Sequence, residues 1–175
     1  MNRVLCCFLA FFIGLSEQAA LVKAVQTGEI IRLHVVAAGD SKEQQRVKIC
    51  VRDAVLEAFG DKMREAKSAV EALAMVDENL FEIEVVAKDA ACKEGYFGPV
   101  NAMTGRYPFP DREYEGVLVP QGDYQALRIV LGEGEGQNWW CILYPALCLA
   151  TASSEPESEE IKIRWHLKDI LKWWF

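Results

Sequence analysis

Histidine is nearly absent from this chain of 175 residues, which holds only His34 and His166. No two cysteines have the Cys-x-x-Cys spacing that structural zinc sites commonly use. Aspartate and glutamate (26 residues) outnumber lysine and arginine (19), which gives a formal net charge of −7. These shortages argue against a zinc site and against a nucleic-acid-binding surface, because neutralising phosphates needs clustered cations. We expect no cofactor.

The glycine-rich run Gly132–Gly136 (GEGEG) lacks the residues that a phosphate site needs. A phosphate loop adds a Lys-Ser/Thr pair to its glycines, and a dinucleotide turn needs the spacing GxGxxG at the start of a helix. Neither pattern is present, and Glu133 and Glu135 would repel phosphate. The run predicts a reversal of the chain after a strand, in which some residues need a positive φ.

The apolar run at the amino end, residues 4–15, is too short to indicate a membrane span. Arg3 precedes it, and Val22-Lys23-Ala24 ends in a small residue that suits signal peptidase. We therefore expect a signal peptide over residues 1–24 and an exported domain over residues 25–150. An uncleaved anchor and a buried core helix are the alternatives.

The first half of the domain predicts one strand followed by helices. Residues 29–37 (EIIRLHVVA) have the β-branched content of a strand with both faces partly covered. A helix of about 18 residues follows, with Ser41 as its cap and an end near Gly60. Residues 67–93 predict two helices that meet near Asn79, although residues 81–86 also alternate as a strand does.

The second half predicts strands and loops. Residues 96–104 suit an edge strand that tolerates Pro99, and residues 106–120 are loop-like except for a short extended piece at residues 117–119. Residues 126–131 (ALRIVL) predict a strand. The fold class is therefore α+β, a single domain with a small mixed sheet of about three to five strands packed by three or more helices.

The carboxyl end divides into two segments. Residues 151–160 are acidic and lack an apolar period, which indicates a linker. Residues 161–175 predict a strand and a short helix that dock on the domain. Their lysines, arginine and tryptophans would also suit peripheral contact with an anionic membrane.

Four cysteines follow the predicted signal peptide: Cys50, Cys92, Cys141 and Cys148. An even number in an exported chain favours disulfides, and Cys141 and Cys148 would close a short loop. Cys50 lies on an apolar helical stripe and fits a free thiol as well as a bridge. Cys141 could instead be a nucleophile paired with His166, as in cysteine hydrolases.

The run DYQALRIVLGEGEGQNWWCILYPALC at residues 123–148 resembles the signature region of the stage II sporulation protein R family. The block IRLHVVAAGDSKEQQRVKICVRDAVLEAF at residues 31–59 is similar to that family's first strand and helix. The likeness spans about residues 29–171. The run Asn138-Trp-Trp-Cys141 is its specific part, whereas Cys50, Cys92 and the acidic insert at residues 151–160 depart from the pattern.

The resemblance implies a signalling protein without catalytic residues, secreted from the forespore into the space between two membranes. The implied partner is a membrane-embedded aspartic protease of the mother cell, which cleaves the sigma-E precursor. The expected contact residues are Gln137, Asn138, Trp139 and Trp140, held in an aromatic turn by a Cys141–Cys148 disulfide. The alternative function is an exported cell-wall hydrolase that uses Cys141 and His166.

Overall fold

The computed structural model describes residues 18–114 and 116–145. After a helix over residues 18–27, the elements in chain order are β1 (Ile31–Val36), α2 (Lys42–Glu65), α3 (Ala69–Glu78), α4 (Leu80–Lys93), β2 (Val100–Phe109), β3 (Arg112–Tyr114), β4 (Val117–Val119), β5 (Gly122–Leu131) and β6 (Asn138–Tyr144).

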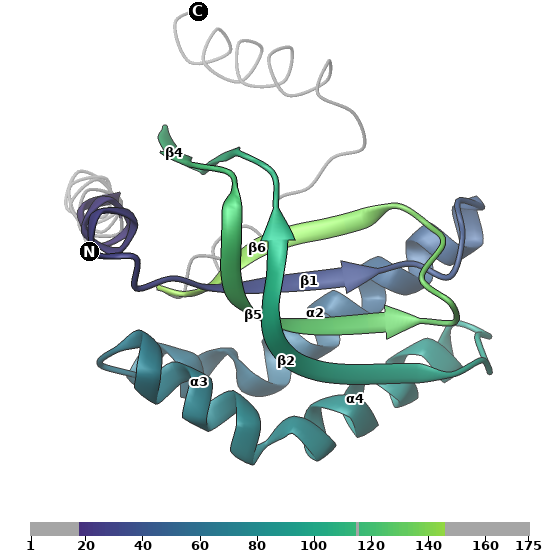
Figure 1. The fold of residues 1–175 in the computed structure, drawn as a ribbon. Helices are drawn as coiled ribbons and strands as arrows, with labels where there is room; N and C mark the ends of the chain where they lie inside the picture. The colour runs from purple at the N-terminus through teal and green to yellow at the C-terminus, as the bar shows by residue number, and fades with distance from the viewer. Residues whose placement is uncertain (1–17, 115, 146–175) are drawn as a thin grey trace, which may run out of the picture.

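The main sheet has the order β2-β5-β1-β6, and β3 and β4 form a separate two-stranded sheet. β1 pairs in parallel with β5 and antiparallel with β6, and β2 pairs antiparallel with β5. Figure 1 shows the three helices α2, α3 and α4 on one side of this sheet. β2 and β5 curve away from the helices toward β4 on the other side. One face of the sheet is therefore covered by helices, and we call the other its helix-free face.

The helices begin where the sequence predicts. The Ser41 side chain accepts a hydrogen bond from the backbone N–H of Gln44 (3.3 Å), and Ser68 does the same for Glu71 (3.2 Å). The predicted division of residues 67–93 into two helices is confirmed, since α3 ends at Glu78 and α4 begins at Leu80. The alternative of a strand over residues 81–86 is wrong.

The predicted end of the first long helix is also wrong. α2 continues through Gly60 to Glu65, because Phe59 and Met63 extend the buried stripe by another turn. The chain leaves the helix at Ala66, whose backbone is extended. Packing against the sheet thus outweighs the unfavourable helix propensity of Gly60.

The region predicted as loop around residues 106–120 holds more strand than expected. β2 runs from Val100 through Phe109 as an edge strand, so it tolerates Pro108, whose ring nitrogen cannot donate a hydrogen bond. Another expectation is corrected at the run Asn138–Cys141, which lies in β6 and not in a turn. The predicted reversal at Gly132–Gly136 is confirmed, with φ of +60° at Gly132 and +70° at Gly134.

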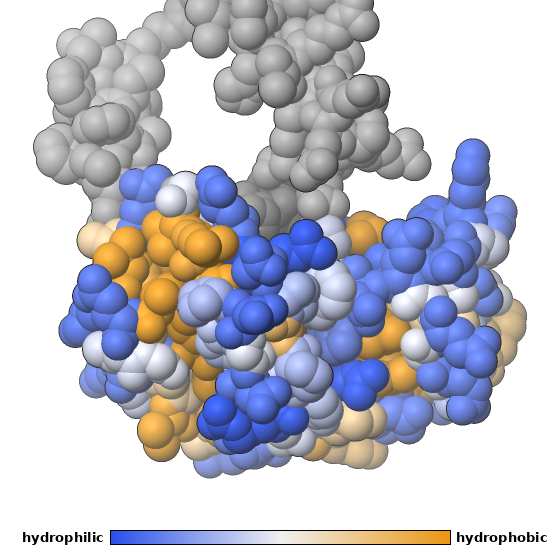
Figure 2. Space-filling model, turned by 45° about the horizontal axis from the view of Figure 1, so that its top comes forward, coloured by the Kyte–Doolittle hydropathy of each residue, from blue (hydrophilic) through white to orange (hydrophobic). Residues whose placement is uncertain are grey.

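The buried apolar residues form two clusters, one on each face of the sheet. The larger cluster lies between the helices and the sheet and includes Leu33, Val51, Ile83 and Leu127. The smaller lies on the helix-free face and comprises Leu21, Ala24, Ile30, Val119 and Ile142. Helix 18–27 and β4 therefore cover one end of the helix-free face. Figure 2 shows an apolar surface on the side where these two elements lie, bordered by hydrophilic side chains.

The predicted fold class is confirmed: the protein is an α+β domain with a mixed four-stranded sheet and a second sheet of two strands. Within residues 18–114 and 116–145, no helix is long and apolar enough to cross a membrane. The predicted linker at residues 151–160 and the segment 161–175 lie outside the described residues.

Candidate functional site: a basic and aromatic face of the sheet

The strand register gathers cationic and aromatic side chains on the helix-free face. On β1, Arg32 and His34 alternate with Leu33, which lies in the core beneath the helices. His34 stands opposite Arg128 of β5 on one side and Trp140 of β6 on the other. With neighbours from β2 and β3, these residues form what we call the basic aromatic face: Arg32, His34, Phe109, Arg112, Arg128 and Trp140.

Arg32 is fully buried at the centre of this face. Its guanidinium carbon lies 4.3 Å from the ring centroid of Phe109, 5.3 Å from that of Tyr124 and 5.6 Å from that of Tyr114. One terminal nitrogen, Nη2, donates a hydrogen bond to the Tyr114 hydroxyl at 2.7 Å. Burial lowers the pKa of Arg32, and Tyr114 acts in the opposite direction. The aromatic rings thus replace part of the hydration that a buried cation loses.

His34 links Trp140 to Asn138. The His34 ring stacks on Trp140 at a centroid distance of 5.8 Å and meets Phe109 edge-on at 5.7 Å. Its Nε2 donates to the side-chain oxygen of Asn138 at 2.7 Å, which assigns the proton of the neutral ring to Nε2. Burial lowers the pKa of His34, and Arg128 and Arg32 lower it further against the effect of the Asn138 hydrogen bond.

Several N–H donors of the face are buried and have no hydrogen-bond partner in the part of the chain that the structure describes. They are Nε and Nη1 of Arg32, Nε of Arg128 and Nε1 of Trp140. Arg112 lies over the Trp140 ring at 5.0 Å, and no ion pair is found for Arg32, Arg112 or Arg128 within the described residues. Within residues 18–114 and 116–145, this acidic protein therefore carries a local concentration of positive charge without ion-paired carboxylates.

The four predicted contact residues separate in the structure. Asn138 and Trp140 belong to the helix-free side, whereas Trp139 faces the helices and its ring lies 4.3 Å from the guanidinium carbon of Arg52. Gln137 lies at the end of the glycine turn, where its backbone N–H donates to the Asp40 carboxylate at 2.8 Å. Trp139 and Gln137 thus fix the strand and the turn, and Trp140 and Asn138 belong to the exposed side of the sheet.

Cys141 is 4% exposed and lies in the core beneath the helices. A nucleophilic thiol needs access and an activating base, so this burial is unfavourable for the hydrolase alternative. His166 and Cys148 lie outside the described residues, and the Cys141–Cys148 bridge stays a prediction. Cys50 and Cys92 are free thiols. Burial and then Glu94 raise the pKa of Cys50, which makes that thiol less reactive.

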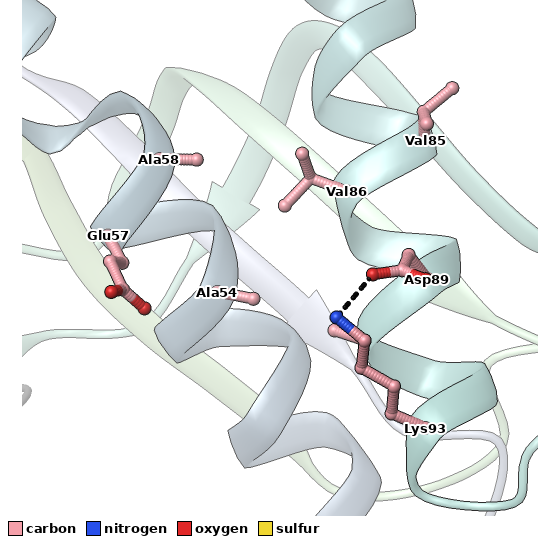
Figure 3. Close-up of a pocket in the computed structure, with 8 residues that line it drawn as sticks. Ala54, Glu57, Ala58, Val85, Val86, Asp89 and Lys93 are labelled. Atoms are coloured by element: carbon pink, nitrogen blue, oxygen red, sulfur yellow. Dashed lines mark ion pairs between the residues drawn. The ribbon is translucent and has the colours of Figure 1, made fainter.

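A hollow of about 530 Å³ lies between α2 and α4. Figure 3 shows Ala54 and Ala58 on one wall, Val86 on the other, and the Asp89–Lys93 ion pair at the rim. The lining is mostly apolar, and its charged groups are the Asp89–Lys93 pair and Glu57, which is a single carboxylate without a neighbouring nucleophile in the lining. In the part of the chain that the structure describes, no cluster of three or more histidines, cysteines or carboxylates could hold a metal ion.

Sequence reasoning placed Arg32, His34 and Arg128 on one side of their strands but gave them no role. Arg112 and Phe109 were given no role in binding, because they belong to a region expected to be a loop. The signal that could have identified the face is an arginine in an apolar strand, since burying such a charge needs a compensating environment.

The fold and this face define a small α+β domain that presents a rigid, positively charged sheet surface. The family model of stage II sporulation protein R matches residues 27–154, and the chain belongs to that family. It is 33% identical to the stage II sporulation protein R of Bacillus subtilis (strain 168) over 147 residues, which cover 81% of this chain and 66% of the relative. The match thus spans just under two thirds of the relative's length. No solved structure matches the chain. Family membership gives the protein a role in sporulation.

Proposed function

We propose that this chain is a secreted forespore signal that activates a membrane-embedded aspartic protease of the mother cell, which then cleaves the sigma-E precursor. The observation that carries the proposal is family membership over residues 27–154. The amino-terminal pattern of Arg3, an apolar run and Ala24 supports export. Signalling occurs in the space between the forespore and mother-cell membranes.

Activation by this domain is a binding event. A ligand shifts a receptor toward its active state only by the difference in its affinity for the two states. The basic aromatic face suits such a contact because Trp140 and Arg112 lie together on it at 5.0 Å, and tryptophan and arginine are enriched among the residues that dominate binding energy.

The test is reconstitution in a host that does not sporulate. This chain, the protease and the sigma-E precursor are co-expressed, and precursor cleavage is followed by immunoblotting. We expect cleavage only when all three are present. Equal cleavage without this chain would falsify the proposal.

A pair of aromatic substitutions locates the contact. Trp140→Ala is expected to reduce cleavage strongly, because it removes the ring between His34 and Arg112. Phe81→Ala is the matched control, since Phe81 is 78% exposed on α4 in the helical layer. Circular dichroism of both variants checks that they fold. A Trp140→Ala variant that folds and signals as the wild type does would remove this face from the contact.

A further inference from the structure

The basic aromatic face has the charge of a site for an anion. Arg128, His34 and Trp140 lie in one row across β5, β1 and β6, and neighbouring strands are about 4.8 Å apart. Arg112 lies over the Trp140 ring at one end of this row. Two guanidinium groups thus flank a platform made of two stacked rings.

Among the described residues, the buried donors of this face lack acceptors. They are Nε of Arg128, Nε1 of Trp140 and two nitrogens of Arg32. Leaving a buried donor unpaired is unfavourable, and more so when the group is charged. All four ion pairs of the described residues lie in or beside the helices: Arg46–Glu94, Arg52–Asp53, Arg64–Asp61 and Lys93–Asp89.

A carboxylate of a partner can reach the exposed side chain of Arg112 and the partly exposed side chain of Arg128, whereas Arg32 is fully buried. Arginine binds a carboxylate through two parallel N–H···O bonds, and such charge-assisted bonds are about twice as strong as neutral ones. Next to the face, β4 exposes the apolar side chain of Leu118. The surface therefore combines positive charge with apolar area, and it suits a segment that combines acidic with apolar residues.

The net charge of the protein decides which kind of anion is favoured. The net charge is −7, so a broad anionic membrane surface also meets acidic side chains of the protein and is repelled by them. A short acidic segment meets only the local positive charge, because solvent-exposed charges are screened beyond about 8–10 Å. A protein segment is therefore favoured over a lipid surface.

We propose that the basic aromatic face binds an acidic segment of the protein partner, with carboxylates of that segment held by Arg128 and by Arg112 at the two ends of the platform that His34 and Trp140 form. This inference deepens the proposed function and rests on it for the identity of the partner. The binding chemistry itself belongs to the face and is measurable without the partner.

The first experiment titrates the full chain with acetyl-tetraglutamate amide and records the side-chain N–H resonances. We expect the indole N–H of Trp140 and the Nε–H of Arg128 to shift, and the tetraglutamine peptide to leave both unchanged. Arg128→Glu should weaken the binding about tenfold or more. Lys88→Glu is the matched control, because it makes the same change of charge at an exposed position of α4. Equal shifts with tetraglutamine, or no shift at Trp140 and Arg128, overturn the inference.

The second experiment uses the reconstituted signalling assay. Arg128→Glu and Arg112→Glu are expected to lower precursor cleavage about tenfold, and Lys88→Glu is expected to leave it unchanged. If the wild type activates the protease and both reversals activate it equally well, the proposed function stands and the acidic-segment inference is wrong. If the wild type fails to activate, the proposed function falls and the peptide titration still decides the binding chemistry.

A sedimentation experiment with vesicles separates the lipid alternative. Phosphatidylglycerol vesicles are incubated with the chain and with Arg128→Glu. We expect the vesicles to retain the wild-type chain no more than they retain Arg128→Glu. The vesicles could retain the wild-type chain but not Arg128→Glu, while tetraglutamate shifts neither resonance. In that case the face binds lipid and the inference is wrong.

Discussion

Arg32 carries its charge on a central strand of the sheet and has no exposed surface. Its Nη2 is bonded to the Tyr114 hydroxyl, which in turn lies 3.4 Å from the backbone oxygen of Trp140. Tyr114 is the terminal residue of β3, so one phenol joins the small sheet to the large one. The position of β3 over the face thus depends on an interaction with a buried cation.

Removing the Tyr114 hydroxyl tests this dependence. We expect Tyr114→Phe to lower the free energy of unfolding by about 1–3 kcal/mol, because it leaves Nη2 of Arg32 unpaired as well. Tyr107→Phe is the control, with an expected change within about 0.5 kcal/mol, because no hydrogen bond to the Tyr107 hydroxyl is found in the described part. Urea unfolding gives both values. Equal losses in the two variants would refute the special role of Tyr114.

His34 makes the stability depend on pH. Its pKa in the folded protein is lowered by burial and then by neighbouring cations, so the unfolded chain binds a proton at higher pH than the folded chain does. Neutral His34 makes its full contribution to the free energy of unfolding above the pKa of about 6.5 that it has in the unfolded chain. This contribution is lost as the pH falls toward the pKa of His34 in the folded protein. The stability advantage of the wild type over His34→Gln should therefore shrink between about pH 7.5 and about pH 5.5. Urea unfolding at both pH values measures it, and an advantage that stays constant would contradict the pKa shift.

At the scale of elements, helix 18–27 contributes to the folded domain. Leu21 has no exposed surface, and it packs with Ala24 in the smaller core against Val119 and Ile142. The predicted signal peptide ends at Ala24, so cleavage there would remove both side chains. The domain that keeps this segment therefore differs in stability from the domain that has lost it.

Leu21→Ala measures that difference in the full chain. A buried leucine truncated to alanine costs about 2–5 kcal/mol, and a similar loss is expected here. Val22→Ala, at a position that is 40% exposed, is the control with a smaller loss. Thermal or urea unfolding of the two variants tests the packing. If Leu21→Ala is no more damaging than Val22→Ala, the helix does not stabilise the domain.

At the scale of the whole molecule, local patterns predicted most elements and long-range packing decided the rest. The β-branched content of residues 31–36 and the cap at Ser41 are local signals, and the structure confirms them. The end of α2 is not local, because Met63 is buried only through contact with the remainder of the core. Residues 138–144 became a strand because β1 offers them an edge, which no turn signal in the sequence reveals.

The candidate site was predictable in part. Trp140 and Asn138 were expected as contact residues because their run resembles the family signature, and the structure puts both on the helix-free side of the sheet. Arg112 approaches Trp140 only because β2 and β5 curve and bring β3 over the sheet. Such curvature depends on the pairing of strands far apart in the chain, so the cationic half of the face could not be predicted from short patterns.

The position of β1 has a consequence for the order in which the chain assembles. β1 begins at Ile31, yet both of its neighbours, β5 and β6, begin at Gly122 or later. A chain that emerges amino end first, from a ribosome or a translocation channel, exposes this strand long before either partner is available. The complete sheet can form only when Tyr144 has emerged. This strand order therefore delays folding of the chain before it has crossed a membrane. The same arrangement leaves a β-branched strand unpaired during synthesis, which makes β1 the segment that most needs protection from aggregation.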